Sequence, residues 1–212
     1  EVTAMKKALL LIDLQKDFCR GGALEVRNSD DVIETANRAI KAFVKNKNLI
    51  IATKDWHPAG HKSFAVNSSA NIGETGMLNG LPQVWWPVHC VENTPGAEFH
   101  DRLNRKNISK IVYKGRDTEV DSYSGFFDNG RKNKTDLNCF LGENEVQELY
   151  IMGLATDYCV KYTVMDALKL GYKVWLIEDG CMGVNINPDD SQKAVEEMKK
   201  NGVLLINSIN LT

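Results

Sequence analysis

The chain has 212 residues, of which 43% are hydrophobic and 25% charged, and its 28 acidic and 26 basic residues give a formal net charge of −2. This length suits one well-buried domain, so we treat residues 1–212 as a single domain in which Glu1–Ala4, ahead of Met5, are a cloning remnant. The near-neutral charge and the scattered basic residues exclude electrostatic attraction to nucleic acid or to an anionic membrane. The expected partner is a small molecule, and a homo-oligomer is left open.

The cysteines and the first apolar run indicate the compartment. Five cysteines are scattered without a Cys-x-x-Cys pair, which disfavours a disulfide framework and favours a reducing environment. Ala8–Ile12 is too short for a signal-peptide core or a membrane span. We therefore expect a cytoplasmic protein.

Short apolar runs alternate with amphipathic segments along the chain. Six runs predict strands buried on both faces of a sheet: Ala8–Ile12, Leu49–Thr53, Ile111–Lys114, Leu149–Gly153, Lys173–Ile177 and Val203–Ile206. Helices are expected from Ser29, over Glu143–Glu148, over Thr156–Leu170 and from Pro188 to near Gly202. Lys54 to about Ser109 and Gly115–Asn138 are predicted to be irregular. The alternation predicts an α/β fold with a six-stranded, mainly parallel sheet and helices on both faces.

Four chemically capable side chains fall where predicted strands end. Asp13 follows the first strand, Asp55 the second and Cys159 the fourth, and Lys114 closes the third. The carboxyl ends of parallel strands share one edge of a sheet, where reactive residues gather in such folds. If the four strands are neighbours, these side chains converge.

Three of these residues have chemistry suited to nucleophilic catalysis. Cys159 falls in the first turn of a predicted helix, where free N–H groups and the helix dipole are expected to lower the pKa of a thiol. Asp13 would accept the thiol proton, and Lys114 between them would stabilise both anions. The alternatives are a buried apolar cysteine, a turn-forming aspartate and a solvated lysine.

A second group of residues has the chemistry of a metal site. Three of the four histidines, His57, His61 and His89, lie within reach of Asp55 in the long irregular stretch. Asp55 and His57 can direct two ligands at one cation and His89 can add a third, which leaves an open coordination position. The alternative is that the histidines bond loop backbone.

Aromatic residues lie in the same stretches: Phe18, Trp56, Trp85 and Trp86. Each one is consistent with core packing. A flat heteroaromatic ligand would also need such walls.

Five stretches in a single register, from about Lys7 to Gly202, resemble the nicotinamidases of the isochorismatase-like hydrolase fold. They are Leu-Ile-Asp13-Leu-Gln-Lys-Asp17-Phe18, Asp55-Trp-His57-Pro-x-x-His61-x-Ser-Phe, Trp86-Pro-Val-His89-Cys-Val, Val-Asp121-Ser-Tyr-Ser-Gly-Phe-Phe-Asp-Asn-Gly and Gly153-Leu-Ala-Thr-Asp-Tyr-Cys159-Val. The resemblance implies that Cys159 is the nucleophile, Asp13 the base and Lys114 the third member of a triad.

The resemblance also implies how the substrate is held. A cis peptide maps to Leu154–Ala155, which would aim the Ala155 N–H, with the Cys159 N–H, at the developing oxyanion. Phe18 and Trp86 would sandwich the substrate ring, and the remaining substrate contacts are expected from Leu154, Ala155 and Tyr158.

One divalent ion is implied, with Asp55, His57 and His89 as ligands and His61 behind them. Zinc is the expected metal and iron or manganese are the alternatives. In the family this ion faces the pyridine nitrogen, and isochorismatases of the same fold lack it.

The activity implied is hydrolysis of nicotinamide to nicotinate and ammonia through a cysteine thioester, feeding NAD salvage, with pyrazinamide as a second substrate. Two other functions remain open. One is a different hydrolase of this fold, an isochorismatase or a carbamoyl-amide hydrolase; the other is a metal-dependent binding protein without turnover.

Overall fold

One parallel sheet of six strands forms the centre of the protein. The computed structural model describes residues 5–212, so the expectation for Glu1–Ala4 lies outside the described residues. The strands lie in the order β5-β2-β1-β6-β7-β8, and every neighbouring pair is parallel. Their bounds are β1 Lys6–Ile12, β2 Leu49–Asp55, β5 Lys110–Lys114, β6 Val146–Leu154, β7 Lys173–Met182 and β8 Leu204–Ile206.

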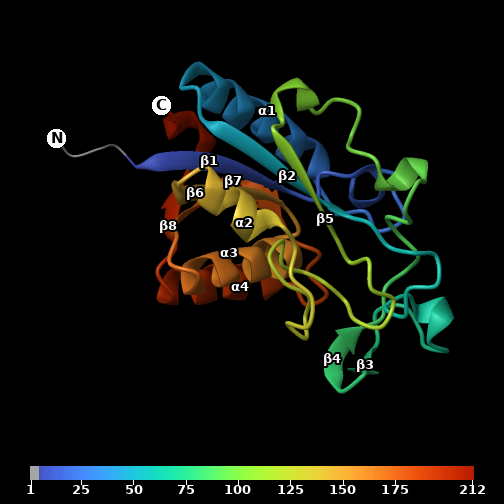
Figure 1. Cartoon of the computed structure of the whole chain (residues 1–212). Coiled ribbons are helices and arrows are strands. Elements are labelled where there is room, and N and C mark those ends of the chain that lie inside the picture. The colour runs from blue at the N-terminus through green and yellow to red at the C-terminus, as the bar shows by residue number, and fades with distance from the viewer. Residues whose placement is uncertain (1–4) are drawn as a thin grey trace.

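Helices cover both faces of this sheet. Helix α1 (Ser29–Lys45) lies on one face, and α2 (Leu137–Glu143), α3 (Lys161–Lys169) and α4 (Asp190–Lys200) lie on the other (Figure 1). The predicted α/β architecture is confirmed. Within residues 5–212, none of the helices has the length and apolar character needed to cross a bilayer.

The central strands are buried because helices pack on both sides of them. Ala8–Ile12 in β1 are 0% exposed, as the continuous apolar run predicts. The apolar stripe of α1, which includes Val32, Ala36 and Ile40, joins the same hydrophobic core. Each fully buried leucine or isoleucine stabilises this core by about 1.5–3 kcal/mol.

The direction of the chain across the sheet reverses at β1. From β1 the chain proceeds to β2 and β5 on one side, and it then crosses to β6, β7 and β8 on the other side. The carboxyl ends of β1 and β6 therefore form the switch point of an open α/β sheet, where such folds bind ligands.

Two details of the fold differ from the sequence prediction. The helix expected over Glu143–Glu148 is wrong: α2 ends at Glu143, Glu145 has φ 56° in a turn, and Glu148 already pairs with Lys7 in the sheet. Leu137 and Leu141, one helical turn apart, are the buried residues that anchor α2 instead.

The second difference is a hairpin within the stretch predicted to be irregular. Strands β3 (Thr75–Leu78) and β4 (Leu81–Val84) pair antiparallel through Asn79 and Gly80. These two residues have φ 49° and 82°, as a tight hairpin turn of this kind requires.

Candidate active site

The strand order places the polar strand ends side by side. Strands β5, β2, β1 and β6 are consecutive neighbours, and Asp55 pairs directly with Lys114 in the parallel register. Asp13 follows β1, and Cys159 lies in a π-helical turn, Thr156–Val160, between β6 and α3. The convergence expected from the sequence is therefore observed.

Lys114 lies at the centre of this group and is 2% exposed. Its Nζ is 2.9 Å from Asp13 Oδ2, 2.5 Å from Asp55 Oδ1 and 3.4 Å from Cys159 Sγ. The same ammonium donates to the Ser122 carbonyl oxygen at 3.0 Å. One lysine thus connects the proposed base, the proposed nucleophile and a proposed metal ligand, and the contact with Asp55 was not predicted.

The ionisation of these groups follows from their burial and proximity. Burial acts to lower the pKa of Lys114, but the Asp13 and Asp55 carboxylates outweigh it and hold that pKa well above its usual value. The lysine therefore remains a cation. Burial also raises the pKa of Asp13, an effect that Lys114 opposes.

The expected lowering of the thiol pKa by the helix terminus is wrong for the free protein. Burial raises the pKa of Cys159 well above its usual value, and Asp13 and Asp55 act in the same direction, while Lys114 opposes them. Full desolvation disfavours the thiolate more than one turn of helix favours it. Cys159 is therefore a thiol at rest and needs a base.

Thr53 fixes one oxygen of Asp13, and the other oxygen is directed at Lys114. Asp13 Oδ1 accepts a hydrogen bond from Thr53 Oγ1 at 2.6 Å, and the Asp13 backbone N–H donates to that same hydroxyl oxygen at 3.1 Å. Its Oδ2 faces the ammonium of Lys114. A carboxylate oxygen of Asp13, one of Asp55 and Cys159 Sγ all lie within 4.8 Å of one another. Thr53, at the end of a predicted strand, was not recognised from the sequence.

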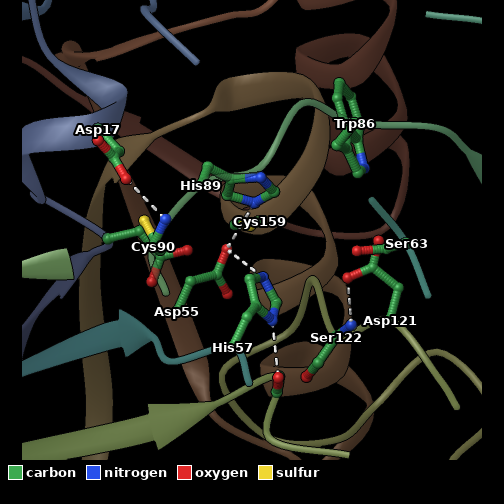
Figure 2. Close-up of polar contacts among 12 residues, drawn as sticks. Asp17, Asp55, His57, Ser63, Trp86, His89, Cys90, Asp121, Ser122 and Cys159 are labelled. Carbon is green, nitrogen blue, oxygen red and sulfur yellow. Dashed lines mark hydrogen bonds and ion pairs between the residues drawn. The ribbon is translucent and has the colours of Figure 1, made fainter. Parts of the chain in front are cut away.

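The two histidines expected to bind metal are oriented by their Nδ1 atoms. His57 Nδ1 is 2.7 Å from the Gly115 carbonyl and His89 Nδ1 is 2.7 Å from the Pro87 carbonyl, so both Nδ1 atoms carry hydrogen. Both Nε2 atoms face Asp55 Oδ2, at 3.5 Å and 3.8 Å (Figure 2). Carbonyl-anchored imidazoles with converging Nε2 lone pairs are the arrangement found around metal ions.

These residues fit a divalent ion. The ligand atoms of Asp55, His57 and His89 lie within 4.8 Å of one another, and His57 Nε2 is buried with no hydrogen-bond partner among the described residues. Two imidazoles and one carboxylate form the donor set of open metal sites. The neighbouring trio Asp13, Asp55 and Cys159 is different, because Lys114 already places a cation between its members.

His61 lies behind this trio rather than in it. The Ser63 N–H donates to His61 Nδ1 at 3.1 Å, so a neutral His61 carries its hydrogen on Nε2 and has no lone pair there for an ion. Burial, followed by the neighbouring His57, lowers the pKa of His61 to about 4 and keeps the ring neutral.

A small, partly open cavity connects the two groups of residues. The members predicted from the sequence are Asp55, His89, Cys159, Phe18, Trp86, Ala155 and Tyr158, and those not predicted are Leu24, Asp121, Tyr123 and Val184. Trp86 packs edge-on against Tyr158 with 4.9 Å between ring centroids, and its Nε1 donates to the Tyr123 hydroxyl at 3.3 Å. The cavity therefore has aromatic walls, and both acidic and thiol groups line it.

The remaining residues expected near the substrate are divided between the cavity and the hydrophobic core. The Leu154–Ala155 peptide is cis; Ala155 lines the cavity, whereas Leu154 packs in the hydrophobic core. Trp85 packs with Ala65 and Leu78 in a small cluster near the hairpin, and Trp56 lies against Tyr113. Trp86 is therefore the member of the Trp85-Trp86 pair that faces the cavity.

The comparison with known proteins agrees with this architecture. Residues 7–209 match the family model described as the isochorismatase domain. The chain belongs to the isochorismatase family.

Within the family, three of the similar proteins are nicotinamidases or pyrazinamidases by name. The nicotinamidase of Escherichia coli is 53% identical over 199 residues, covering 94% of this chain and 93% of that protein. A solved nicotinamidase and pyrazinamidase of Acinetobacter baumanii has a TM-score of 0.92 at 37% identity, covering 99% of this chain and 100% of that one. A pyrazinamidase of Pyrococcus horikoshii, solved in complex with zinc, has a TM-score of 0.80 at 40% identity, covering 95% and 99% of the two chains.

Proposed function

We propose that this protein is a nicotinamidase, which hydrolyses nicotinamide to nicotinate and ammonia and so feeds NAD salvage in the cytoplasm. One observation carries the proposal: Asp13, Lys114 and Cys159 meet in an aromatic-walled cavity that also contains Asp55 and His89. The names of the similar proteins support the same substrate class.

In this proposal the thiol of Cys159 forms the covalent intermediate. Asp13 takes the thiol proton as sulfur attacks the carboxamide carbon, and Lys114 stabilises the thiolate and keeps Asp13 ionised in its buried position. The N–H groups of Ala155 and Cys159 stabilise the tetrahedral anion, which is worth about 3–4 kcal/mol per donor in comparable sites.

The same carboxylate then completes both halves of the reaction. Asp13 returns its proton to the leaving ammonia as the thioester forms. It next accepts a proton from the water that attacks the thioester carbon, and it passes this proton to the departing sulfur, which leaves the free thiol and nicotinic acid that ionises to nicotinate. Phe18 and Trp86 hold the aromatic ring during both steps, and Tyr158 closes the wall beside Trp86.

Asp55, His57 and His89 would hold one divalent ion, with zinc as the metal and iron or manganese as alternatives. The zinc-bound pyrazinamidase at 40% identity supports zinc, as do the converging Nε2 atoms. A bound ion supplies a Lewis acid for the ring nitrogen of the substrate.

The zinc-loaded protein is expected to release ammonia from nicotinamide and from pyrazinamide, because both are flat azine carboxamides that fit the cavity. A coupled ammonia assay over a substrate panel measures this. Isochorismate and N-carbamoyl amides, which lack an azine ring beside a carboxamide, are expected to be poor substrates. Preferential turnover of either of them would assign the chain to another hydrolase of the fold.

Replacing His57 or His89 with alanine is expected to deplete the bound metal and to raise KM for nicotinamide by roughly 10-fold or more, because each supplies a ligand atom. Elemental analysis and steady-state kinetics measure both effects. His100→Ala is the matched control, since His100 is the one histidine outside the proposed ion site and its Nδ1 accepts the Arg102 N–H instead. Full metal content in the His57 and His89 variants would remove these residues as ligands.

A further inference from the structure

Asp121 is a buried carboxylate that the mechanism above does not use. It is 4% exposed and lines the cavity together with Asp55, His89 and Cys159. Its Oδ1 accepts the Ser122 N–H at 2.8 Å and its Oδ2 accepts the Gln83 side-chain amide at 2.8 Å.

Both partners of Asp121 are neutral. Among residues 5–212, no lysine, arginine or histidine nitrogen lies within 4.0 Å of its carboxylate oxygens. A carboxylate taken out of water without a counter-charge is costly, so such groups normally face a cation or a metal centre.

Two further buried polar groups lie on the segment that follows His57. His61 and Ser63 are both 0% exposed, and neither His61 Nε2 nor Ser63 Oγ has a hydrogen-bond partner among the described residues. The Lys62 N–H donates to the Thr118 carbonyl at 2.9 Å, which holds the His61–Ser63 segment against the segment that leads to Asp121. Figure 2 draws Ser63 and Asp121 across His57 from Asp55.

His61 packs against a proposed ligand of the ion, and Asp121 shares the cavity with two others. The ring centroid of His61 is 4.4 Å from that of His57. Asp55 supplies the one negative charge of the ligand set and shares it with Lys114, which bonds its other oxygen. A second negative charge close to the site would favour a doubly charged ion, and an unpaired donor and hydroxyl would bond water molecules of its shell.

We infer that Asp121, together with His61 and Ser63, forms an outer polar layer that holds the water ligands of the ion and balances its charge. The inference rests on the ion site proposed above. Asp121 acts through the water ligands, so it is a positioning residue rather than a catalytic one.

The test is zinc affinity, measured on the metal-free protein by titration against a competing chromophoric chelator. Asp121→Asn keeps the size of the side chain and removes its charge, and it is expected to bind zinc roughly 10- to 100-fold more weakly than wild type. Glu119→Gln is the control, because Glu119 is a carboxylate of the same loop that pairs with Lys62 at the surface. The control is expected to bind zinc as tightly as wild type.

Thermal unfolding separates this role from a purely structural one. The zinc-free Asp121→Asn protein is expected to unfold cooperatively, at a somewhat lower temperature than zinc-free wild type, because an amide group replaces one of two oxygens that accept hydrogen bonds. Added zinc should raise its midpoint less than it raises that of wild type. A lower zinc-free midpoint with unchanged zinc affinity would show that Asp121 only supports the hairpin through Gln83.

A second variant keeps the inference testable if Asp121→Asn does not fold. Ser63→Ala is expected to weaken zinc binding as well. An unchanged zinc affinity in this variant would contradict the inferred role of the outer polar layer. Wild-type protein that binds no zinc would overturn the proposed ion site itself. Wild-type protein that binds zinc and hydrolyses nicotinamide, with Asp121→Asn of equal affinity, would overturn this inference alone.

Discussion

Cys159→Ala is expected to lower kcat for nicotinamide by at least about 10⁴-fold, because the acyl intermediate has no other sulfur to form on. Cys159 Sγ is the atom that lies 3.4 Å from the Lys114 ammonium and lines the cavity. Zinc content and nicotinamide binding should persist in this variant, since the sulfur is neither a proposed ligand of the ion nor a proposed contact of the substrate ring. Steady-state ammonia release, zinc analysis and calorimetric titration with nicotinamide measure the three properties.

Cys139→Ala is the matched control for this experiment. Cys139 is exposed on α2 and contacts Glu143, so its loss should leave turnover at the wild-type rate. Normal turnover by Cys159→Ala would exclude the thioester route, and would point to direct attack by a water molecule on the carboxamide.

Lys114→Met has the second largest expected effect, because it removes the one cation shared by Asp13, Asp55 and Cys159. We expect kcat/KM to fall by roughly 10²- to 10⁴-fold. The two buried carboxylates lose their counter-charge, so the free energy of unfolding should fall by about 3–5 kcal/mol. Kinetics and chemical denaturation of the same preparation measure both changes.

The pH profile tells the proposed role of Lys114 from simple loss of packing. Lys114 opposes the burial that raises the pKa of Asp13, so its removal raises that pKa further. The acidic limb of kcat/KM should therefore move to higher pH in Lys114→Met. Lys110→Met, on the same strand but paired with Asp136 at the surface, is expected to keep the wild-type profile. An unmoved acidic limb in Lys114→Met would contradict the proposed role.

The position of the reactive residues at one edge of the sheet could be predicted, because the apolar runs that mark the strands also determine the type of sheet. The apolar run Ala8–Ile12 needed two covered faces, which requires a parallel sheet, and a parallel sheet places Asp13, Asp55 and Lys114 on one edge. The strand order was not predictable from these runs. That order makes β5, β2, β1 and β6 neighbours and determines that the side chains touch.

The hairpin and helix α2 were not predicted, because both are short and have weak sequence patterns. Asn79-Gly80 is one of three Asn-Gly pairs, a dipeptide typical of hairpin turns, yet only four residues on each side pair, so no alternating pattern accompanied it. The helix Leu137–Glu143 is only seven residues long, and its two buried leucines lie ahead of the segment chosen from the sequence.

Two features of the site could not be predicted, because tertiary packing determines them. Asp121 and Tyr123 line the cavity because the loop after β5 folds back over the sheet edge, which no local periodicity encodes. The pKa of Cys159 was also judged from its place in a helix, whereas complete burial beside two carboxylates determines its direction. The first error is an omission of two loop residues, and the second is a wrong environment for a correctly chosen residue.

A crystal structure of zinc-loaded Cys159→Ala with nicotinamide, recorded with anomalous scattering from zinc, tests the proposed site most directly. The prediction is a zinc peak among Asp55, His57 and His89, with the pyridine ring between Phe18 and Trp86 and the carboxamide carbon beside position 159. A zinc peak elsewhere, or a carboxamide directed away from position 159, would contradict it.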